Sequence, residues 1–309
     1  MAQPFRLHHP WLVAVWPGMG HVALNAVYYL LSKLEMHVIA ELEVANLFDV
    51  DQVDVRDGRI QNVEHPRNRF FVWTDPRERH DLVIFLGEAQ PPVGKYAFCR
   101  SLLEYARELG VERVFTFAAM ATMMHPSHRS RVFGAATDEA GVEELKRLEL
   151  QLLREGNISG LNGVLLGAAA EQGLPGTCLL GEMPHLFSQL PFPKASHAIL
   201  EVFTTITGIQ LDFAELAEQV EVADRQLGEL LVQVEEKYGP QFTPEEETYE
   251  AEAEQEPGLS AESAERIEKL FQQAKRDRSK AFELKRELDR QGVFGDYEDR
   301  FLDLFKKAG

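Results

Sequence analysis

The sequence predicts an α/β fold, built on a mixed sheet with helices on both of its faces. Between residue 11 and about residue 208, short apolar runs alternate with segments whose apolar residues recur at helical spacing. The strand predicted at residues 81–86 is continuously apolar after Asp81, as a central strand covered on both faces would be. With 309 residues and a hydrophobic content of 45%, the chain is long enough to bury a sizeable core.

Each element follows from a local pattern. An apolar strand at residues 11–16 leads through two glycines into a helix whose apolar positions keep helical spacing (Leu24, Val27, Leu31 and Leu34). Further strands are predicted at residues 36–41, 69–73, 81–86, 111–117, 131–135 and 176–180, and further helices at residues 94–109, 138–147 and 161–172. Asp57-Gly58, between two alternating stretches, is a strong hairpin signal and departs from a regular βαβ order.

The C-terminal part of the chain changes character and predicts a helical extension. After Gly208, apolar residues repeat at three-then-four spacing over three heptads, which predicts a helix with a seam for another helix. We expect this seam to mediate oligomerisation or docking; it consists of Phe213, Leu216, Val220, Leu227, Leu230 and Val234. Residues 243–262 contain eight glutamates and no basic residue, as in a solvated linker. We therefore predict an α/β domain (1–240), an acidic linker (241–262) and a helical tail (263–309).

The tail is predicted to contain a second amphipathic helix from about residue 260 to residue 290. Its apolar stripe consists of Ile267, Leu270, Ala274, Ala281, Leu284 and Leu288, and Phe294, Tyr297, Phe301 and Leu304 extend the spacing into a short last helix. Two interpretations are open at this point. The tail is either an oligomerisation or docking module, or an accessory helix that folds onto its own domain.

The composition argues against several classes of function. The formal net charge is −18, from 50 acidic and 32 basic residues, and such a surface repels nucleic acids and anionic membranes. The N-terminal residues show no secretory signal pattern, and no apolar run approaches the roughly 18 residues of a membrane span. We expect a cytoplasmic protein whose two cysteines, Cys99 and Cys178, are buried thiols.

The glycine turn after the first strand supports two interpretations. The pattern Gly18-x-Gly20-x-x-Ala23, with Glu41 at about the right distance to bind a ribose, is the fingerprint of a dinucleotide-binding turn. The same glycines also suit a tight strand-to-helix turn, either without a ligand or with an anion at the helix N-terminus. Pro17 removes a backbone donor just before the turn, which weakens the dinucleotide interpretation.

Acidic residues follow two of the predicted strands. Glu88 and Glu182 both lie just beyond a predicted strand end, where open α/β sheets place their ligand crevices, and a carboxylate pair there could act as acid and base. His185 lies close to Glu182 in the sequence. The sequence contains neither a P-loop nor a Gly-x-Ser-x-Gly elbow, so it shows no recognisable catalytic set.

His125 and His128 flank a Pro-Ser turn, and Arg129 follows them directly. Three interpretations are open for this cluster. It could bind an anion through charge-assisted donors, it could bind a metal if a third ligand came from elsewhere, or its histidines could simply bond to the local backbone. The third interpretation is favoured, because no third metal ligand lies nearby in the sequence, and we predict no metal site.

Four blocks in order along the chain resemble the proteasome assembly chaperone 2 family, in its bacterial and archaeal branch. They are Pro17-Gly-Met-Gly-His21-Val, Leu82-Val-Ile-Phe-Leu-Gly-Glu88-Ala-Gln90-Pro, His125-Pro-Ser-His128-Arg129 with the strand after it, and residues 160–185 with Gly181-Glu182-Met-Pro-His185 at their end. The resemblance covers residues 11 to about 235. It implies a three-layer αβα sandwich, similar to the nucleoside phosphorylase/hydrolase-like fold, followed here by the helical extension.

The resemblance also implies a non-enzymatic protein without a cofactor, which acts as a homo-oligomer on protein partners. Two alternatives from other classes are an enzyme acting on a nucleotide-like small molecule, in a phosphorylase/hydrolase-like or ATP-grasp-type manner, and an NAD-binding protein. The residues expected at the cleft or anion site are Gly18, Gly20, His21, Glu88, Gln90, His125, His128, Arg129, Glu182 and His185. The resemblance implies that ring-docking chaperones of this group can use a C-terminal hydrophobic-Tyr-any tail. The sequence closes on Lys306-Lys-Ala-Gly309, which argues against a proteasome link of that kind.

Overall fold

The structure of the chain is a computed structural model. It describes residues 7–49, 53, 55–63, 65–238 and 261–276, and single residues between 280 and 304. The chain divides into two compact units, residues 1–243 and 244–309. Each unit is described by itself.

Unit 1 is built around an eight-stranded sheet with the order β2-β5-β6-β1-β7-β10-β8-β9. The strands are β1 (Trp11–Val15), β2 (His37–Glu41), β5 (Asn68–Trp73), β6 (Leu82–Gly87), β7 (Arg113–Thr122), β8 (Val132–Ala136), β9 (Gln151–Leu152) and β10 (Gly176–Pro184). The four central strands β6, β1, β7 and β10 are parallel, whereas β2 and β5, and β8 on the other side, run antiparallel to their inner neighbours. The sheet is therefore mixed, as predicted.

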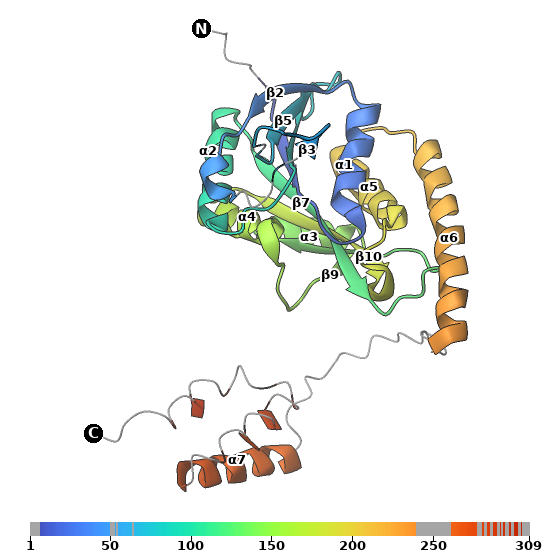
Figure 1. The fold of residues 1–309 in the computed structure, drawn as a ribbon. Helices are drawn as coiled ribbons and strands as arrows, with labels where there is room; N and C mark the ends of the chain where they lie inside the picture. The colour runs from blue at the N-terminus through green and yellow to red at the C-terminus, as the bar shows by residue number, and fades with distance from the viewer. Residues whose placement is uncertain are drawn as a thin grey trace. The chain divides into compact units, whose positions relative to one another are not determined.

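Helices cover both faces of this sheet, so the predicted three-layer αβα arrangement is confirmed (Figure 1). On one face lie α1 (Val22–Lys33), α3 (Glu139–Arg147), α5 (Pro193–Thr207) and α6 (Ala214–Tyr238); on the other lie α2 (Lys95–Glu108) and α4 (Gly160–Glu171). Each face has its own apolar core, because alternate residues of a strand point to opposite sides. In β1, Val13 and Val15 pack toward α1, and Leu12 and Ala14 pack toward α2 and α4.

Two central strands extend further than the sequence predicts. β7 continues beyond residue 117 and β10 beyond residue 180, and they pair in parallel as far as Thr122 and Pro184. Glu182 thus lies inside β10 and not beyond its end, which corrects the prediction. The strand continues through this charged residue because Arg131 neutralises it in place, at 2.7 Å.

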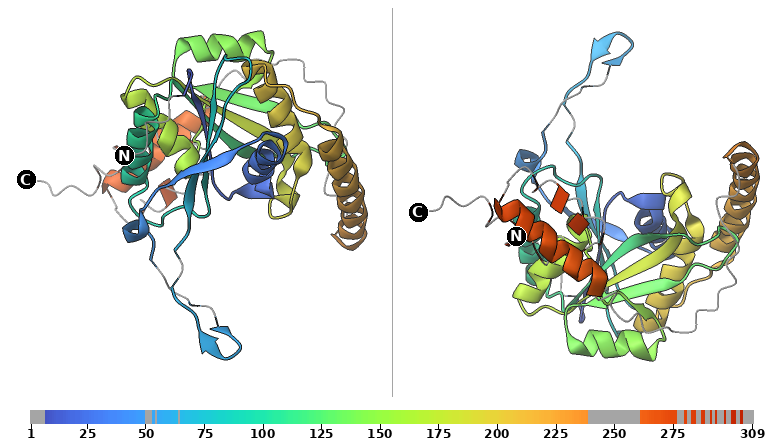
Figure 2. Two further views of the ribbon diagram at one scale, coloured as in Figure 1. Left: turned by 90° about the horizontal axis from the view of Figure 1, so that it is seen from above. Right: turned by 90° about the horizontal axis from the view of Figure 1, so that it is seen from below.

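The predicted hairpin at Asp57-Gly58 is confirmed. β3 (Val55–Arg56) and β4 (Arg59–Ile60) pair antiparallel and form a two-stranded sheet that is separate from the main one. Asp57 and Gly58 both have positive φ angles, 51° and 75°, as a two-residue type I′ turn requires. Both views of Figure 2 show the hairpin standing out from the rest of the unit.

α6 packs on its own chain. Leu216 and Leu227, which belong to the predicted seam, are buried in the core shared with α1 and α5. Leu230 is 40% exposed, and Leu231 is buried in its place. The heptad count misplaces this residue because a straight helix has 3.6 and not 3.5 residues per turn. The other seam residues, Phe213, Val220 and Val234, are half-buried.

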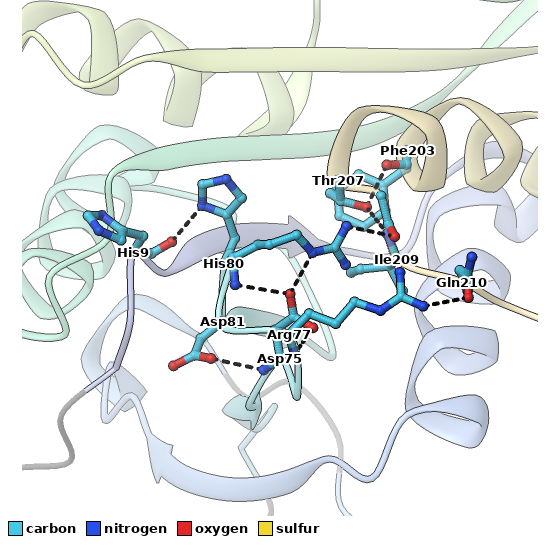
Figure 3. A network of polar contacts seen from close by, with 11 residues as sticks. His9, Asp75, Arg77, His80, Asp81, Phe203, Thr207, Ile209 and Gln210 are labelled. Atoms are coloured by element: carbon cyan, nitrogen blue, oxygen red, sulfur yellow. Dashed lines mark hydrogen bonds and ion pairs between the residues drawn. The ribbon is translucent and has the colours of Figure 1, made fainter.

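The loop between β5 and β6 holds the end of α5. Asp75 is 3% exposed and accepts hydrogen bonds from the backbone N–H of Arg77 and from Nε of Arg79, both at 3.0 Å. Arg79 in turn donates from Nη1 to the carbonyl oxygen of Gly208 at 3.0 Å, and Arg77 donates to Gln210 at 2.8 Å (Figure 3). These bonds fix the point at which the chain leaves α5 toward α6.

The C-terminal unit has an apolar core of its own. α7 (Ala261–Arg276) contributes Ile267, Leu270, Phe271 and Ala274, which pack with Leu284 and Leu288 and, less deeply, with Val293, Tyr297, Phe301 and Leu304. The apolar stripe predicted for the tail is thus largely buried inside this unit. Residues 241–260 of the predicted acidic linker, Ala281 and Phe294 lie outside the described residues. None of the helices in the described part of the chain has the length and apolar character that crossing a membrane requires.

Candidate functional site

The glycine turn after β1 is bound from both sides by the segment that follows β10. The backbone N–H of Gly20 donates to the carbonyl of Ser188, and the carbonyl of Gly20 accepts from the N–H of Phe192, both at 2.9 Å. Gly20 has a φ of +59°, and a Cβ at this position would lie 2.7 Å from Sδ of Met183. The turn therefore requires glycine at position 20 for its conformation and for its packing on β10.

The dinucleotide interpretation of this turn is not supported by the geometry. The N–H of Gly20 is already used within the chain. Glu41, the expected ribose ligand, lies on the edge strand β2, which β5 and β6 separate from β1. Its carboxylate accepts hydrogen bonds from Nε and Nη2 of Arg67, at 3.1 and 2.9 Å. His21, exposed and with a φ of +51°, precedes α1 without a side-chain cap.

Gln90 lies in the loop that follows β6. The helices that follow these neighbouring strands, α1 and α2, lie on opposite faces of the sheet, which is the arrangement that creates a ligand crevice in open α/β sheets. Nε2 of Gln90 lies 3.4 Å from the carbonyl oxygen of Pro17, and Oε1 accepts from the N–H of Leu161 at 3.1 Å. The side chain thus connects the glycine turn to the start of α4. Gly18 has extended backbone, and a Cβ added there would meet no atom within 4 Å.

Glu182 is a buried carboxylate that accepts hydrogen bonds from side chains of its own chain. Its side chain is 1% exposed and receives two hydrogen bonds from Arg131, at 2.7 Å each, and one from Oγ1 of Thr122, also at 2.7 Å. Burial by itself raises the pKa of Glu182, but the hydrogen bonds and charge of Arg131 and the bond from Thr122 outweigh it, so the pKa is lowered. An ionised, fully bonded carboxylate is a poor general base.

Glu88 has a different environment, far from Glu182. It lies just after β6, is 40% exposed, and accepts from the N–H of Arg67 at 2.9 Å and from Nη2 of Arg69 at 2.5 Å. β1 and β7 lie between β6 and β10, so three strand spacings separate the two sites, about 14 Å. Glu88 and Glu182 therefore do not form the carboxylate pair that the sequence left open for acid–base chemistry.

The His125–His128 turn is held by a lysine. Lys194, at the start of α5, donates from Nζ to the carbonyl oxygens of Pro126 and His128, at 2.6 and 3.1 Å, and forms an ion pair with Asp224 of α6 at 2.8 Å. The ring centroids of His125 and His128 lie 5.5 Å apart. Burial and the neighbouring His128 lower the pKa of His125.

The remaining members of this cluster do not complete a metal or anion site. Arg129 forms an ion pair with Glu201 at 3.1 Å, and His185 is exposed at the start of the short helix η3 (His185–Phe187). Among the residues that the structure describes, no group of three histidine, cysteine or acidic side chains could hold a metal ion.

Burial raises the pKa of Cys99 to about 12 and that of Cys178 to about 11, so both thiols are protonated near neutral pH.

Three large apolar side chains are exposed around the carboxyl end of the parallel strands. Met19 is 43%, Leu190 is 38% and Met123 is 65% exposed. The hydrogen bonds of Gly20 place Met19 beside the segment that follows β10, which contains Leu190. The pairing of Thr122 with Pro184 places Met123 near the start of the same segment. We call Met19, Met123 and Leu190 the apolar rim. The rim was not predicted from the sequence, although two of its members lie next to predicted motifs.

Comparison with known proteins agrees with this architecture. The family model described as the PAC2 family matches residues 12–231. The chain belongs to the PAC2 family. This confirms the family predicted from the four sequence blocks.

Solved and curated relatives support the assignment. The chain is similar to Pyrococcus furiosus PbaB, an archaeal proteasome activator, with 27% identity and a TM-score of 0.63 over 72% of this chain and 94% of PbaB. It is also similar to a proteasome-assembly chaperone homologue from Mycobacterium tuberculosis, with 25% identity and a TM-score of 0.64 over 72% of this chain and 96% of that one. An uncharacterised protein from Methanocaldococcus jannaschii is 27% identical over 213 residues, which are 68% of this chain and 78% of the relative.

Proposed function

We propose that this PAC2 protein is a non-enzymatic, chaperone-like protein that binds other protein chains and acts as a homo-oligomer in the cytoplasm. One observation supports this proposal above the others. Glu182 and Gln90 at the carboxyl end of the sheet are hydrogen-bonded to partners within the chain, whereas the apolar rim is exposed. A surface of flexible, apolar methionines is suited to binding protein partners.

The similarity to PbaB suggests which client to test first. PbaB is an archaeal proteasome activator, and the mycobacterial relative is a proteasome-assembly chaperone homologue. We therefore propose proteasome α subunits as the first candidate client. The net charge of −18 argues against nucleic acids and anionic membranes as partners.

The test compares rim variants with a matched surface variant. Met19→Asp combined with Met123→Asp places charges on the rim, and Tyr28→Asp places one on an exposed position of α1 (Tyr28 is 53% exposed). We expect the rim variant to lose at least tenfold in affinity for purified α subunits in sedimentation or interferometry, and Tyr28→Asp to bind as the unmodified chain does. Equal binding by both variants would exclude the rim as the binding surface. No binding by the unmodified chain would exclude this client.

The enzyme alternative has a separate test. A protein that acts on a nucleotide-like molecule is stabilised by it, by about 2.7 kcal/mol at a hundredfold excess over Kd. We expect nucleotides, nucleosides and NAD to leave the melting temperature of the chain unchanged. A clear rise with one of them would contradict the non-enzymatic proposal.

Self-association through the 213–234 seam stays a prediction, and it would require α6 to leave its packed position. Leu216 and Leu227 pack on α1 and α5 of their own chain. Self-association through the same residues would require α6 to leave that position and exchange between copies.

A further inference from the structure

The face of the sheet that carries α1 is only partly covered by helices. In β5, the three residues that point toward α2 are buried, whereas the three that point to the α1 face, Arg69, Phe71 and Trp73, are half-buried. On the neighbouring edge strand β2, Val38 lies opposite Phe71 and is 55% exposed. The next strand inward, β6, is buried on both faces. In the described part of unit 1, helix coverage of the α1 face therefore ends at β6.

α1 borders the uncovered strands with an apolar flank. Tyr29, on the flank that faces α6, donates a hydrogen bond to the carbonyl oxygen of Asp212 at 2.5 Å. Leu24 and Leu31 lie on the opposite flank and are half-buried, and Tyr28 lies between them at its outer edge and is 53% exposed. α1, α5 and α6 follow one another away from β2 and β5 (Figure 1). The flank with Leu24 and Leu31 is therefore the one turned toward these strands.

The two sets of side chains make one apolar surface at the margin of the core shared with α1. We call it the open shelf, and it consists of Leu24, Tyr28, Leu31, Val38, Phe71 and Trp73. Half of its members are aromatic, and aromatic residues are enriched in protein–protein interfaces. An apolar surface of this kind, left exposed on a folded chain, indicates a binding site for another protein surface.

The charged groups at the edge of the open shelf balance one another. Arg69 pairs with Glu88 at 2.5 Å, and Arg67 pairs with Glu41 at 2.9 Å. The whole chain, by contrast, has a formal net charge of −18, so most surfaces of two copies repel each other. An apolar surface whose edge charges are already paired can meet a second copy of itself without this repulsion.

We propose that two copies of the chain associate through their open shelves, about a two-fold axis. This proposal rests on the proposed homo-oligomer and names its interface. A two-fold contact uses the same surface on both copies, so that surface has to be complementary to itself, and an apolar patch with balanced charges meets this condition. The chain's own C-terminal unit is a poorer occupant, because its apolar side chains, Ile267, Phe271 and Leu284 among them, already pack in a core of their own.

Charges placed on the open shelf test the contact. Tyr28→Asp with Val38→Asp (the shelf variant) is expected to weaken self-association of the full chain at least tenfold, measured by analytical ultracentrifugation. The matched control is Val222→Asp with Val232→Asp on α6, at positions 51% and 54% exposed, which adds the same two charges away from the shelf. Its self-association should match that of the unmodified chain. Both variants should keep the circular dichroism of the unmodified chain, because every substituted side chain is more than half exposed.

The unmodified chain offers two further measurements of the same contact. Association of two acidic copies through an apolar surface should strengthen with salt, because the Debye length falls from about 10 Å at 0.1 M to about 3 Å at 1 M and the repulsion is screened. The emission of Trp73, taken as the difference between the unmodified chain and Trp73→Phe, should shift to longer wavelength on dilution. The shift is expected because water reaches the half-buried indole when the copies separate.

The open shelf shares no residue with the apolar rim. The shelf variant should therefore keep the affinity of a single copy for purified α subunits, as expected for Tyr28→Asp alone. Failure of the shelf contact would leave the proposed client untouched, since the client is tested on the rim.

Three results would overturn the proposal, and they are distinguishable. If the shelf variant associates as strongly as the unmodified chain, or if the α6 control loses as much, the interface is wrong while the oligomer stands. If the unmodified chain is a monomer at micromolar concentration, both the interface and the oligomeric part of the proposed function are wrong. If the oligomer separates on dilution while the Trp73 emission stays constant, the copies meet through another surface.

Discussion

Two ends of parallel strands in this sheet each present a glutamate, and the two residues have opposite environments. Inside β10, two residues before its end, Glu182 is 1% exposed and bonded to Arg131 and Thr122. At the end of β6, Glu88 is 40% exposed and bonded to Arg67 and Arg69. Burial makes the first ion pair a requirement of the fold, because a lone buried charge is costly, whereas water can replace the partners of the second.

The largest expected effect is on the buried pair. Arg131→Ala leaves Glu182 buried without its main partner, and breaking a buried pair in this way costs about 3–5 kcal/mol. Urea unfolding monitored by circular dichroism measures the loss. The matched variant at the other site, Arg69→Ala, should lose about 1 kcal/mol or less. Similar losses for both variants would contradict the distinction between the two sites.

The glycine turn allows a second comparison, between a backbone position packed on β10 and one in open space. Gly20→Ala introduces a Cβ at a φ of +59° and 2.7 Å from the side chain of Met183, next to Glu182. We expect a loss of about 1–3 kcal/mol in unfolding free energy. Gly18→Ala, two residues earlier in extended backbone and open space, should change stability by less than about 0.5 kcal/mol. Equal losses would show that the packing on β10 does not constrain the turn.

The pH dependence of the unfolding free energy should reflect the ionisation of the buried Glu182. Because the pKa of Glu182 in the folded chain lies below its unfolded value, its stabilising contribution is complete above the unfolded pKa and is lost as pH falls through the folded one. The stability gap between the unmodified chain and Glu182→Gln should therefore narrow below about pH 4.5. Unfolding curves measured at intervals from pH 7 to pH 3 check this. A constant gap would mean that this carboxylate does not titrate in that range.

The smallest effect is expected at the exposed site. Glu88→Gln keeps the shape of the side chain and removes its charge, and exposed pairs contribute about 0–1 kcal/mol. We expect the unfolding midpoint to shift only slightly, and to shift less at high salt, where the pair is screened. A loss of several kcal/mol would show that Glu88 is as constrained as Glu182.

Local patterning was enough to predict the layers of the fold. The continuously apolar run of β6 and the helical spacing of α1 each depend on residues close together in the sequence, and both are present in the structure. α5 was not predicted separately. A sequence signal for this helix was present, because its buried residues Ala195, Ile199 and Phe203 recur at helical spacing.

The candidate site was only partly predictable, because its partners come from distant parts of the chain. The glycine turn could be found from its spacing, but its close approach to Met183 joins it to β10, which is distant in the sequence. Glu88 and Glu182 look alike in the sequence, since each ends an apolar run; only the strand order separates them. The role of Lys194 had no sequence signal, because its partners are backbone oxygens of a turn about 66 residues away.

The bond from Arg79 to the carbonyl of Gly208 has a consequence for the order of folding. It joins residues 129 apart in the sequence, so the entropy of closing that loop must be lost before the bond can form, and we expect the bond to form late. We expect Arg79→Ala to leave the folding rate nearly unchanged and to speed unfolding, in stopped-flow measurements with urea. A slower folding rate would instead place this bond in the transition state. If it forms last, the link between α5 and α6 is also the first part of unit 1 to open.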